Sequence, residues 1–193
     1  MDKYQIISSA EEQFAREVTL GVMIQRPLPA LLYIIPGMFI FEYLRRTTAI
    51  RRYTETFMFP RKLALQAARD LLNGYEDTSV EMRIETEIKA WLESHHLLHP
   101  ELSQAQKAAV QVLIEHYTRL LQSDGETYYN LVEGAYKTRS DFKQHINEIA
   151  AAEKEVDRAI LSVRADSEQL KKKMEQEEQQ VAQRRAKILD AIY

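Results

Sequence analysis

The chain has 193 residues and a formal net charge of −3, with 28% of its residues charged and no cysteine. This near-neutral balance argues against nucleic acid as the main partner, because phosphate binding needs a concentrated cationic field. The lack of cysteine excludes disulfides, thiolate metal sites and a cysteine nucleophile.

Helix-forming residues dominate the composition, and there are only five glycines and five prolines. We therefore predict an all-α fold. The first expected helix covers residues 10–25. Ser9 and Glu12 have the spacing of a capping box, in which a hydroxyl and a carboxylate satisfy free N–H groups at a helix start. Pro27 and Pro29 end this helix, because proline disfavours helical backbone in the residue before it.

Residues 28–41, LPALLYIIPGMFIF, are an uncharged run and the most informative stretch of the chain. Pro36 has no N–H to donate to the carbonyl of Leu32, so we expect a kink or a break at Pro36-Gly37. The uncharged stretch from Pro27 to Phe41 reaches only about 22 Å as a helix, short of a hydrocarbon core of about 30 Å. A single transmembrane span is therefore disfavoured. The run fits a segment that dips into the membrane surface and turns back, or a buried core helix.

A second helix is expected after Gly37, running through Phe57 and stopping at Pro60. Its aromatic and aliphatic side chains share one side of the helix, and most of its cations lie across the axis. The arginines concerned are Arg45, Arg46, Arg51 and Arg52, of which Arg46 lies beside the apolar side. The pattern is that of a basic amphipathic helix, which suits an anionic membrane surface.

Turn residues and apolar periodicity predict four helices in the middle of the chain. They cover residues 61–73, 79–95, 103–122 and 127–136. We divide the chain into an N-terminal region with the apolar and basic segments, a helical domain and a long C-terminal heptad helix. The corresponding boundaries are 1–60, 61–139 and 140–193.

Residues 140–193 contain no glycine or proline, which predicts one helix about 80 Å long at about 1.5 Å per residue. Apolar residues at alternating spacings of four and three form a coiled-coil seam along it. The seam is interrupted by Glu153, Glu177 and Arg184. Alanines flank the seam up to Val163, so this half is expected to pack into the domain. Charged residues flank it beyond Arg164, so the second half is expected to project.

Histidine and glycine patterns give little support for chemistry. Glu93 and His96 form one Glu-x-x-His motif, whereas di-iron bundles use two such motifs and two further glutamates. His95 and His116 lie on apolar helix faces and are expected to be hydrogen-bonded core or boundary residues. No glycine-rich phosphate loop or nucleophile elbow is present. We therefore predict no catalytic, cofactor or metal site.

The leading hypothesis is a non-enzymatic helical scaffold on the cytoplasmic face of the inner or cell membrane. It attaches to anionic lipid and meets a protein partner or a second copy through the C-terminal helix. The start of the chain lacks the cationic and apolar regions of a secretory signal, which agrees with that location. The expected membrane-associating residues are Leu31, Leu32, Tyr33, Ile34, Ile35, Pro36, Met38, Phe39, Phe41, Arg45, Arg46, Arg51 and Arg52. The expected coiled-coil interface is Val163, Leu170, Met174, Val181 and Ile188.

Two alternatives follow from the same sequence. In the first, the protein is a soluble, cytoplasmic all-α adaptor or complex subunit. Its apolar run is core or protein interface, and its long helix folds back on its own domain. In the second, the helical domain holds a polar pocket with an enzymatic activity that no motif identifies.

Overall fold

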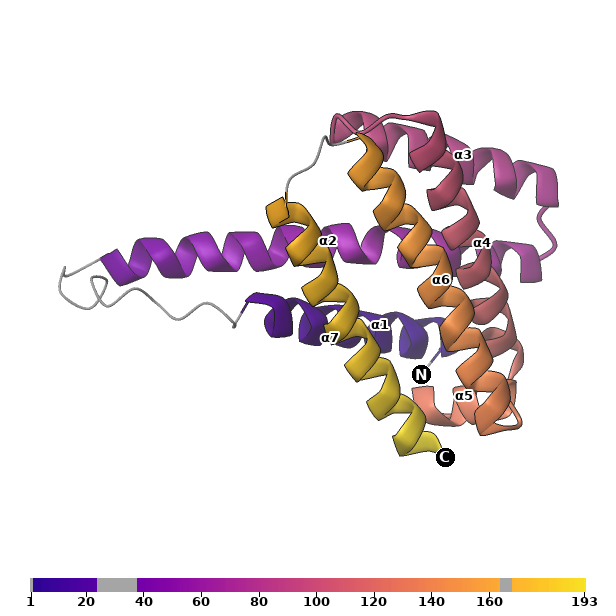
Figure 1. Ribbon diagram of the computed structural model, residues 1–193. Coiled ribbons are helices and arrows are strands. Elements are labelled where there is room, and N and C mark those ends of the chain that lie inside the picture. Colours follow the sequence, from indigo (N-terminus) through magenta and orange to yellow (C-terminus); the bar gives the residue numbers. More distant parts are fainter. Residues whose placement is uncertain (1, 24–37, 164–167) are drawn as a thin grey trace.

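The computed structural model describes residues 2–23, 38–163 and 168–193, and excludes the side chains of residues 23, 38–46 and 169. Within these ranges every element is an α-helix (Figure 1). In chain order the helices are α1 Lys3–Met23, α2 Met38–Leu72, α3 Asp77–Ser94, α4 Pro100–Gln122, α5 Tyr128–Ala135, α6 Arg139–Val163 and α7 Glu168–Ile192. The predicted all-α class is confirmed.

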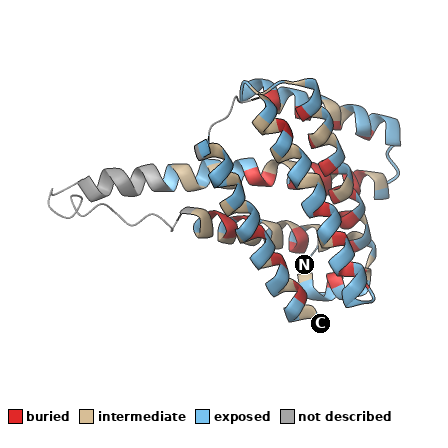
Figure 2. Ribbon diagram, in the orientation of Figure 1, coloured by how far each residue is buried: buried red, intermediate tan, exposed pale blue. Residues whose placement is uncertain are grey.

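One apolar core draws side chains from each of these helices. Ile7 of α1, Ile88 of α3, Leu120 of α4 and Leu131 of α5 are completely buried in it. Leu189 brings α7 into the same cluster, although it is almost at the end of the chain. Figure 2 shows the buried residues concentrated where the helices cross, with the exposed residues on the outside.

The first helix begins earlier than the capping signal predicted. It starts at Lys3, and the Asp2 carboxylate accepts a hydrogen bond from the Tyr4 N–H at 3.4 Å. Ser9 and Glu12 therefore lie inside α1 and do not cap it. The reason is burial, because the added turns place Ile6 and Ile7 in the core and tertiary packing overrides a local signal.

The predicted stop at Pro60 is also wrong, since α2 continues through it to Leu72. Proline at this position has no N–H for the carbonyl of Thr56. The guanidinium of the next residue, Arg61, donates a hydrogen bond from Nη1 to the carbonyl of Phe57, beside Thr56, at 3.0 Å. The residues after Pro60 bury Leu63, Ala64 and their neighbours in the core, and this burial favours a continuous helix.

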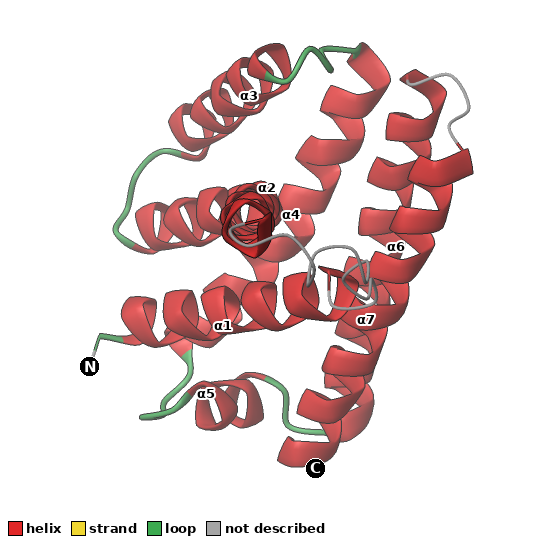
Figure 3. Ribbon diagram, turned by 90° about the vertical axis from the view of Figure 1, so that its left-hand side faces the viewer, coloured by secondary structure: helices red, strands yellow, loops and turns green. Residues whose placement is uncertain are grey.

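The single C-terminal helix expected over residues 140–193 is instead two helices, α6 and α7, with residues 164–167 between them outside the description. The two run side by side in Figures 1 and 3, and α7 also packs on α1. Folding back lets both halves bury apolar side chains against the same bundle. A lack of glycine and proline permits a long helix but contributes little free energy against such burial.

The middle helices α3, α4 and α5 agree with their predicted ranges to within a few residues at each end. The first turns of α2 project past the end of α1 (Figure 1). We call residues 38–50 of α2 the arm. Within the described residues, no helix has both the length and the apolar character needed to cross a bilayer.

Candidate functional site

The predicted membrane-associating residues fall into three groups by what the structure describes. Leu31, Leu32, Tyr33, Ile34, Ile35 and Pro36 lie outside the described residues. Met38, Phe39, Phe41, Arg45 and Arg46 lie in the arm, but their side chains are outside the description. Arg51 and Arg52, at the base of the arm, are exposed, and Arg51 Nε lies 2.8 Å from the Glu55 carboxylate one turn on.

A buried network of charges joins four helices at the centre of the bundle. Arg61 of α2 is only 5% exposed, and it lies 3.2 Å from the Glu11 carboxylate of α1 and 2.8 Å from the Glu153 carboxylate of α6. Arg185 of α7 binds both oxygens of Glu153, at 2.7 and 2.9 Å. The Phe57 ring lies under the Arg61 guanidinium, 3.8 Å from Cζ to the ring centre. The network therefore fixes how α1, α2, α6 and α7 are placed relative to one another.

The groups of this network hold one another in their charged forms. Burial alone disfavours the Arg61 cation, but the carboxylates of Glu153 and Glu11 outweigh it and raise the pKa of Arg61. Burial likewise disfavours the Glu153 carboxylate, and the neighbouring Arg185 and Arg61 lower its pKa below the usual value. Arg61 and Glu153 therefore keep opposite charges inside the bundle, and their ion pair holds α2 and α6 together.

Two buried histidines stack beside this network. His116 and His145 have ring centres 4.6 Å apart, and His116 Nδ1 shares a hydrogen bond of 2.8 Å with the Tyr136 hydroxyl. Burial lowers the pKa of His116 far below its usual value and that of His145 to about 4, so both rings are neutral at pH 7. The expectation that His116 is a hydrogen-bonded core residue is confirmed. His95 is exposed and lies against Trp91, with ring centres 4.3 Å apart.

Two cavities adjoin the network, and Arg61 and Arg185 line both of them. The smaller has a volume of about 440 Å³ and lies between α1, α5, α6 and α7, beside the buried histidines. The larger, of about 750 Å³, is an apolar groove between α2, α4, α6 and α7. Its apolar lining includes Phe57, Trp91, Ile146, Val156, Met174 and Val181.

The groove also contains carboxylates that the network does not neutralise. Among the described residues, the ion pairs here join Glu153 to Arg61 and Arg185, and Lys154 to Glu178. They leave out Asp157 of α6 and Glu177 of α7. Burial, followed by the charge of Glu177, raises the pKa of Asp157 to about 7. Burial also raises the pKa of Glu177.

The residues predicted to form a coiled-coil interface lie on the inner side of α6 and α7. Val181 is 6% exposed and packs with Ala15, Val18, Phe57 and Met58 of α1 and α2. Ile188 packs against the main core, and Leu170 and Met174 line the groove. Val163 is half-buried at the end of α6. In this chain the seam is thus used for intramolecular packing.

The sequence predicted the seam but not the charge network and the groove that lie along it. Glu153, Glu177 and Arg184 were read as defects of a heptad pattern, yet Glu153 is the centre of the charge network and Glu177 lies in the groove. A charged residue at a seam position is a signal of a buried polar site when the helix packs against its own domain. The partners Glu11 and Arg61 carry no comparable signal in the sequence.

No three or more histidine or acidic side chains of the described residues lie close enough together to hold a metal ion. Comparison with known protein families, with curated proteins and with solved structures finds no match to this chain.

Proposed function

We propose that the protein is a non-enzymatic helical scaffold that attaches to the cytoplasmic surface of a membrane through residues 28–59. The observation that carries this proposal is the projecting arm. The apolar run 28–41 is joined to the arm on one side and follows α1 on the other, and the two helix ends lie on the same side of the bundle (Figure 1). That geometry presents one end of the molecule to a surface and leaves the bundle outside it.

Charge at the base of the arm supports an anionic surface. Arg51 and Arg52 are exposed, and a lysine or arginine near an anionic leaflet contributes about 1 kcal/mol of attraction. The Arg51–Glu55 pair is 82% and 61% exposed, so this ion pair is weak and leaves Arg51 able to turn toward lipid headgroups.

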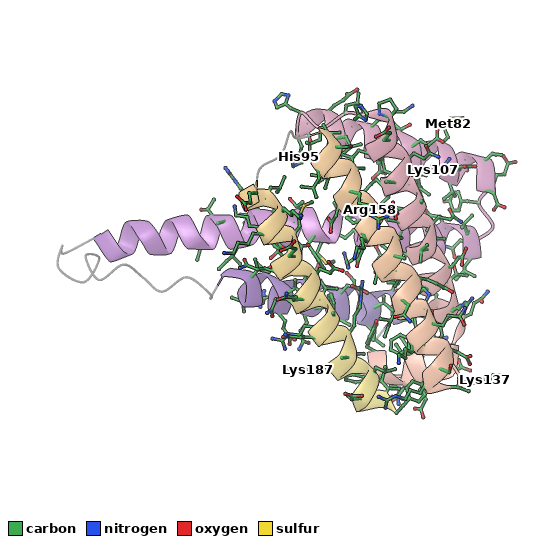
Figure 4. All side chains as sticks on the ribbon, viewed as in Figure 1. Met82, His95, Lys107, Lys137, Arg158 and Lys187 are labelled. Carbon is green, nitrogen blue, oxygen red and sulfur yellow. The ribbon has the colours of Figure 1, made fainter. Side chains whose placement is uncertain are left out.

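The test is co-sedimentation with vesicles of neutral lipid alone and of neutral lipid mixed with anionic lipid. Wild-type protein is expected to sediment with the anionic vesicles at low salt. Arg51→Glu with Arg52→Glu reverses two charges and is expected to weaken binding by about tenfold or more. The matched control is Lys89→Glu with Lys137→Glu, which makes the same charge change at exposed sites on the bundle and is expected to bind normally. Lys137 lies at the end of the bundle away from the arm (Figure 4).

Ile35→Asp tests the apolar contribution separately, because it places a charge in the run without altering the arginines. It is expected to reduce binding to both kinds of vesicle. A wild-type protein that stays in the supernatant with every vesicle would instead support the soluble adaptor or complex subunit. The packing of α7 onto α1 and α6 is the feature that favours this second candidate, because it matches a C-terminal helix folded back on its own domain.

A further inference from the structure

The smaller of the two cavities lies where α5 meets α1 and the C-terminal half of α7, with α6 along its side. Figure 3 shows α5 beside α1 and next to the C-terminal end of α7. The volume of about 440 Å³ is within the range of about 300–1,000 Å³ that is typical of pockets for small molecules. Because the lining comes from several helices, the cavity depends on the whole fold and not on the surface of one helix.

The walls of this cavity are rich in aromatic rings. Phe14 of α1, Tyr128 of α5 and Phe142 of α6 all line it. Phe142 is buried, and the other two rings are half-buried. Leu113 of α4 and Ile149 of α6 add aliphatic surface. Rings on three sides favour a flat, apolar ligand that can stack on them.

The charged side chains of the lining have little need of a charged ligand. Most of them already belong to ion pairs, with 2.7 to 3.2 Å between the charged atoms. These pairs are Glu11–Arg61, Glu17–Arg184 and Glu153–Arg185. Among the described residues of the lining, Lys187 is the charged side chain without an ion pair, and it is exposed to solvent. The buried part of the cavity therefore offers an ionic ligand no unpaired charge.

His145 is the polar side chain of the cavity that lacks a hydrogen-bond partner. It is 5% exposed, and its Nε2 atom is buried without a hydrogen bond to any described residue. The other ring nitrogen, Nδ1, lies 3.6 Å from a carboxylate oxygen of Glu148, which is outside the lining. Because a carboxylate attracts an N–H, we assign the proton of the neutral ring to Nδ1. Nε2 is then a hydrogen-bond acceptor without a donor.

The aromatic neighbours of His145 hold its ring in place but do not supply that donor. His116 and Tyr136 stack on it, with ring centres 4.6 and 5.3 Å away. The Tyr136 hydroxyl is already hydrogen-bonded to Nδ1 of His116, at 2.8 Å. A buried acceptor usually has a donor in a folded protein, so its absence here points to a group that comes from outside the chain.

We propose that this cavity binds a phenol of one or two fused rings, which stacks on Phe14, Tyr128 and Phe142 and donates a hydrogen bond from its hydroxyl group to Nε2 of His145. A purely apolar ligand would leave this nitrogen unsatisfied, and an anion would have to leave water without gaining a buried cation. The site does not depend on membrane attachment, because none of its lining residues belongs to residues 28–59.

The first test compares three ligands of similar shape with wild-type protein in the absence of vesicles. Equilibrium dialysis measures the binding of 2-naphthol, of 2-fluoronaphthalene, which has no proton to donate, and of 2-naphthoate, which is an anion. We expect saturable binding of one 2-naphthol per chain, at least tenfold tighter than either of the other two ligands. The comparison is stringent, because 2-fluoronaphthalene is the most apolar of the three and would be preferred by a site that selects for apolar surface alone.

Nuclear magnetic resonance of the histidine rings reports on the acceptor itself. In ¹⁵N-labelled wild-type protein, 2-naphthol is expected to move the Nε2 resonance of His145 to lower frequency, as a nitrogen that accepts a hydrogen bond does. The Nδ1 resonance is expected to remain that of an N–H nitrogen. 2-Fluoronaphthalene is expected to leave the frequency of Nε2 nearly unchanged.

His145→Phe removes the acceptor and keeps a flat ring at the same position. We expect it to weaken 2-naphthol binding at least tenfold and to leave the binding of 2-fluoronaphthalene unchanged or stronger. His95→Phe is the matched control, because it makes the same change at an exposed histidine. His95 lies at the opposite end of the bundle from Lys187, which lines the cavity (Figure 4). Circular dichroism melting checks that both variants fold.

Three results with wild-type protein would overturn the proposal, and none of them requires a variant. They are equal affinity for 2-naphthol and 2-fluoronaphthalene, tightest binding of 2-naphthoate, and no saturable binding of 2-naphthol. The last result would mean that water alone satisfies His145. Vesicle binding is measured in a different experiment, so the loss of one activity leaves the other to be judged on its own.

Discussion

Arg61 of α2 is paired with carboxylates of α1 and α6, and its removal is expected to destabilise the fold strongly. Arg61→Met leaves the Glu11 carboxylate without this cation and leaves Glu153 with Arg185 alone. Removing one partner of a buried ion pair typically costs about 3–5 kcal/mol, because the remaining charge is stranded out of water. Urea unfolding is expected to show a loss of this size, and Glu153→Met combined with it is expected to cost less than the sum of the two single changes.

The exposed pair Arg51–Glu55 is the natural control for this cycle. Its charged atoms are also 2.8 Å apart, but the pair is exposed and lies within one helix, whereas Arg61–Glu153 is buried and joins two helices. Arg51→Met is expected to change the free energy of unfolding by less than about 0.5 kcal/mol. If Arg61→Met were as mild as Arg51→Met, the charge network would not be what holds the four helices in place.

His145 is expected to make the fold sensitive to acid. Its pKa is about 4 in the folded chain and its ordinary value is 6.5, so between these pH values the unfolded chain binds a proton that the folded chain does not. Stability is therefore full above pH 6.5 and falls as the pH drops toward 4, by up to about 3 kcal/mol. Urea unfolding of wild type and of His145→Gln at a series of pH values is expected to show a shallower decline in the variant.

The comparison that isolates His145 is between the pH dependence of stability in wild type and in His145→Gln, because other groups titrate in the same pH interval. Asp157 has a raised pKa, so its contribution has the opposite sign and grows less favourable as the pH rises from 4 to 7. His96→Gln serves as the control, since that side chain is exposed and is expected to leave the slope unchanged. If the free energy of unfolding had the same slope against pH in wild type and in His145→Gln, protonation of His145 would not be what destabilises the fold in acid.

The site was only partly predictable at this scale. The charges at seam positions 153 and 177 are visible in the sequence, but their partners Arg61 and Tyr53 come from a helix about a hundred residues away. A heptad pattern says which face of a helix is buried and not what covers it. His116 was predicted as a core residue because its neighbours on that helix face are apolar, and this needed no knowledge of the partner.

At the scale of the elements, α7 is expected to behave as part of the bundle. Val181 is 6% exposed among Ala15, Val18, Phe57 and Met58. Val181→Asp therefore buries an unpaired carboxylate, and we expect a loss of at least about 3 kcal/mol in urea unfolding. Light scattering is expected to give the same mass for the variant as for wild type wherever both are folded.

Gln183→Asp introduces the same group at an exposed position of α7 and is expected to have little effect on stability. The contrary result would be a wild-type dimer that Val181→Asp converts into a folded, equally stable monomer. That would show that the seam joins two chains, as the heptad pattern by itself allows.

The helices were predictable in number and type wherever turn chemistry marks their ends. Asn73-Gly74 separates α2 from α3, and Ser123-Asp124-Gly125 separates α4 from α5. Gly74 has the positive φ of 85° that favours glycine there. The predicted helix end at Pro60 and the predicted single helix over residues 140–193 were wrong because both rest on local signals. The free energy that decides these places comes from packing against residues distant in sequence.

For the whole molecule, the important fact is that one core includes side chains from Ile6 to Leu189. The division at residues 60 and 139 was based on composition and periodicity and stays a prediction. Because α1, α2, α4 and α7 share this core, each of them buries its apolar side chains only against the others. This favours a single cooperative unit, whereas separate units would each need their own core.

Unfolding in urea is therefore expected to give one transition, with the same midpoint by circular dichroism and by Trp91 fluorescence. Leu189→Ala removes a core side chain of α7, which is 8% exposed and lies outside the helix of Trp91. It is expected to cost about 2–4 kcal/mol and to lower both midpoints equally. Leu98→Ala, at a side chain that is 50% exposed, is the control and is expected to change little. If Leu189→Ala left the urea midpoint of Trp91 fluorescence unchanged, the C-terminal helices would unfold separately, as the division at residue 139 implies.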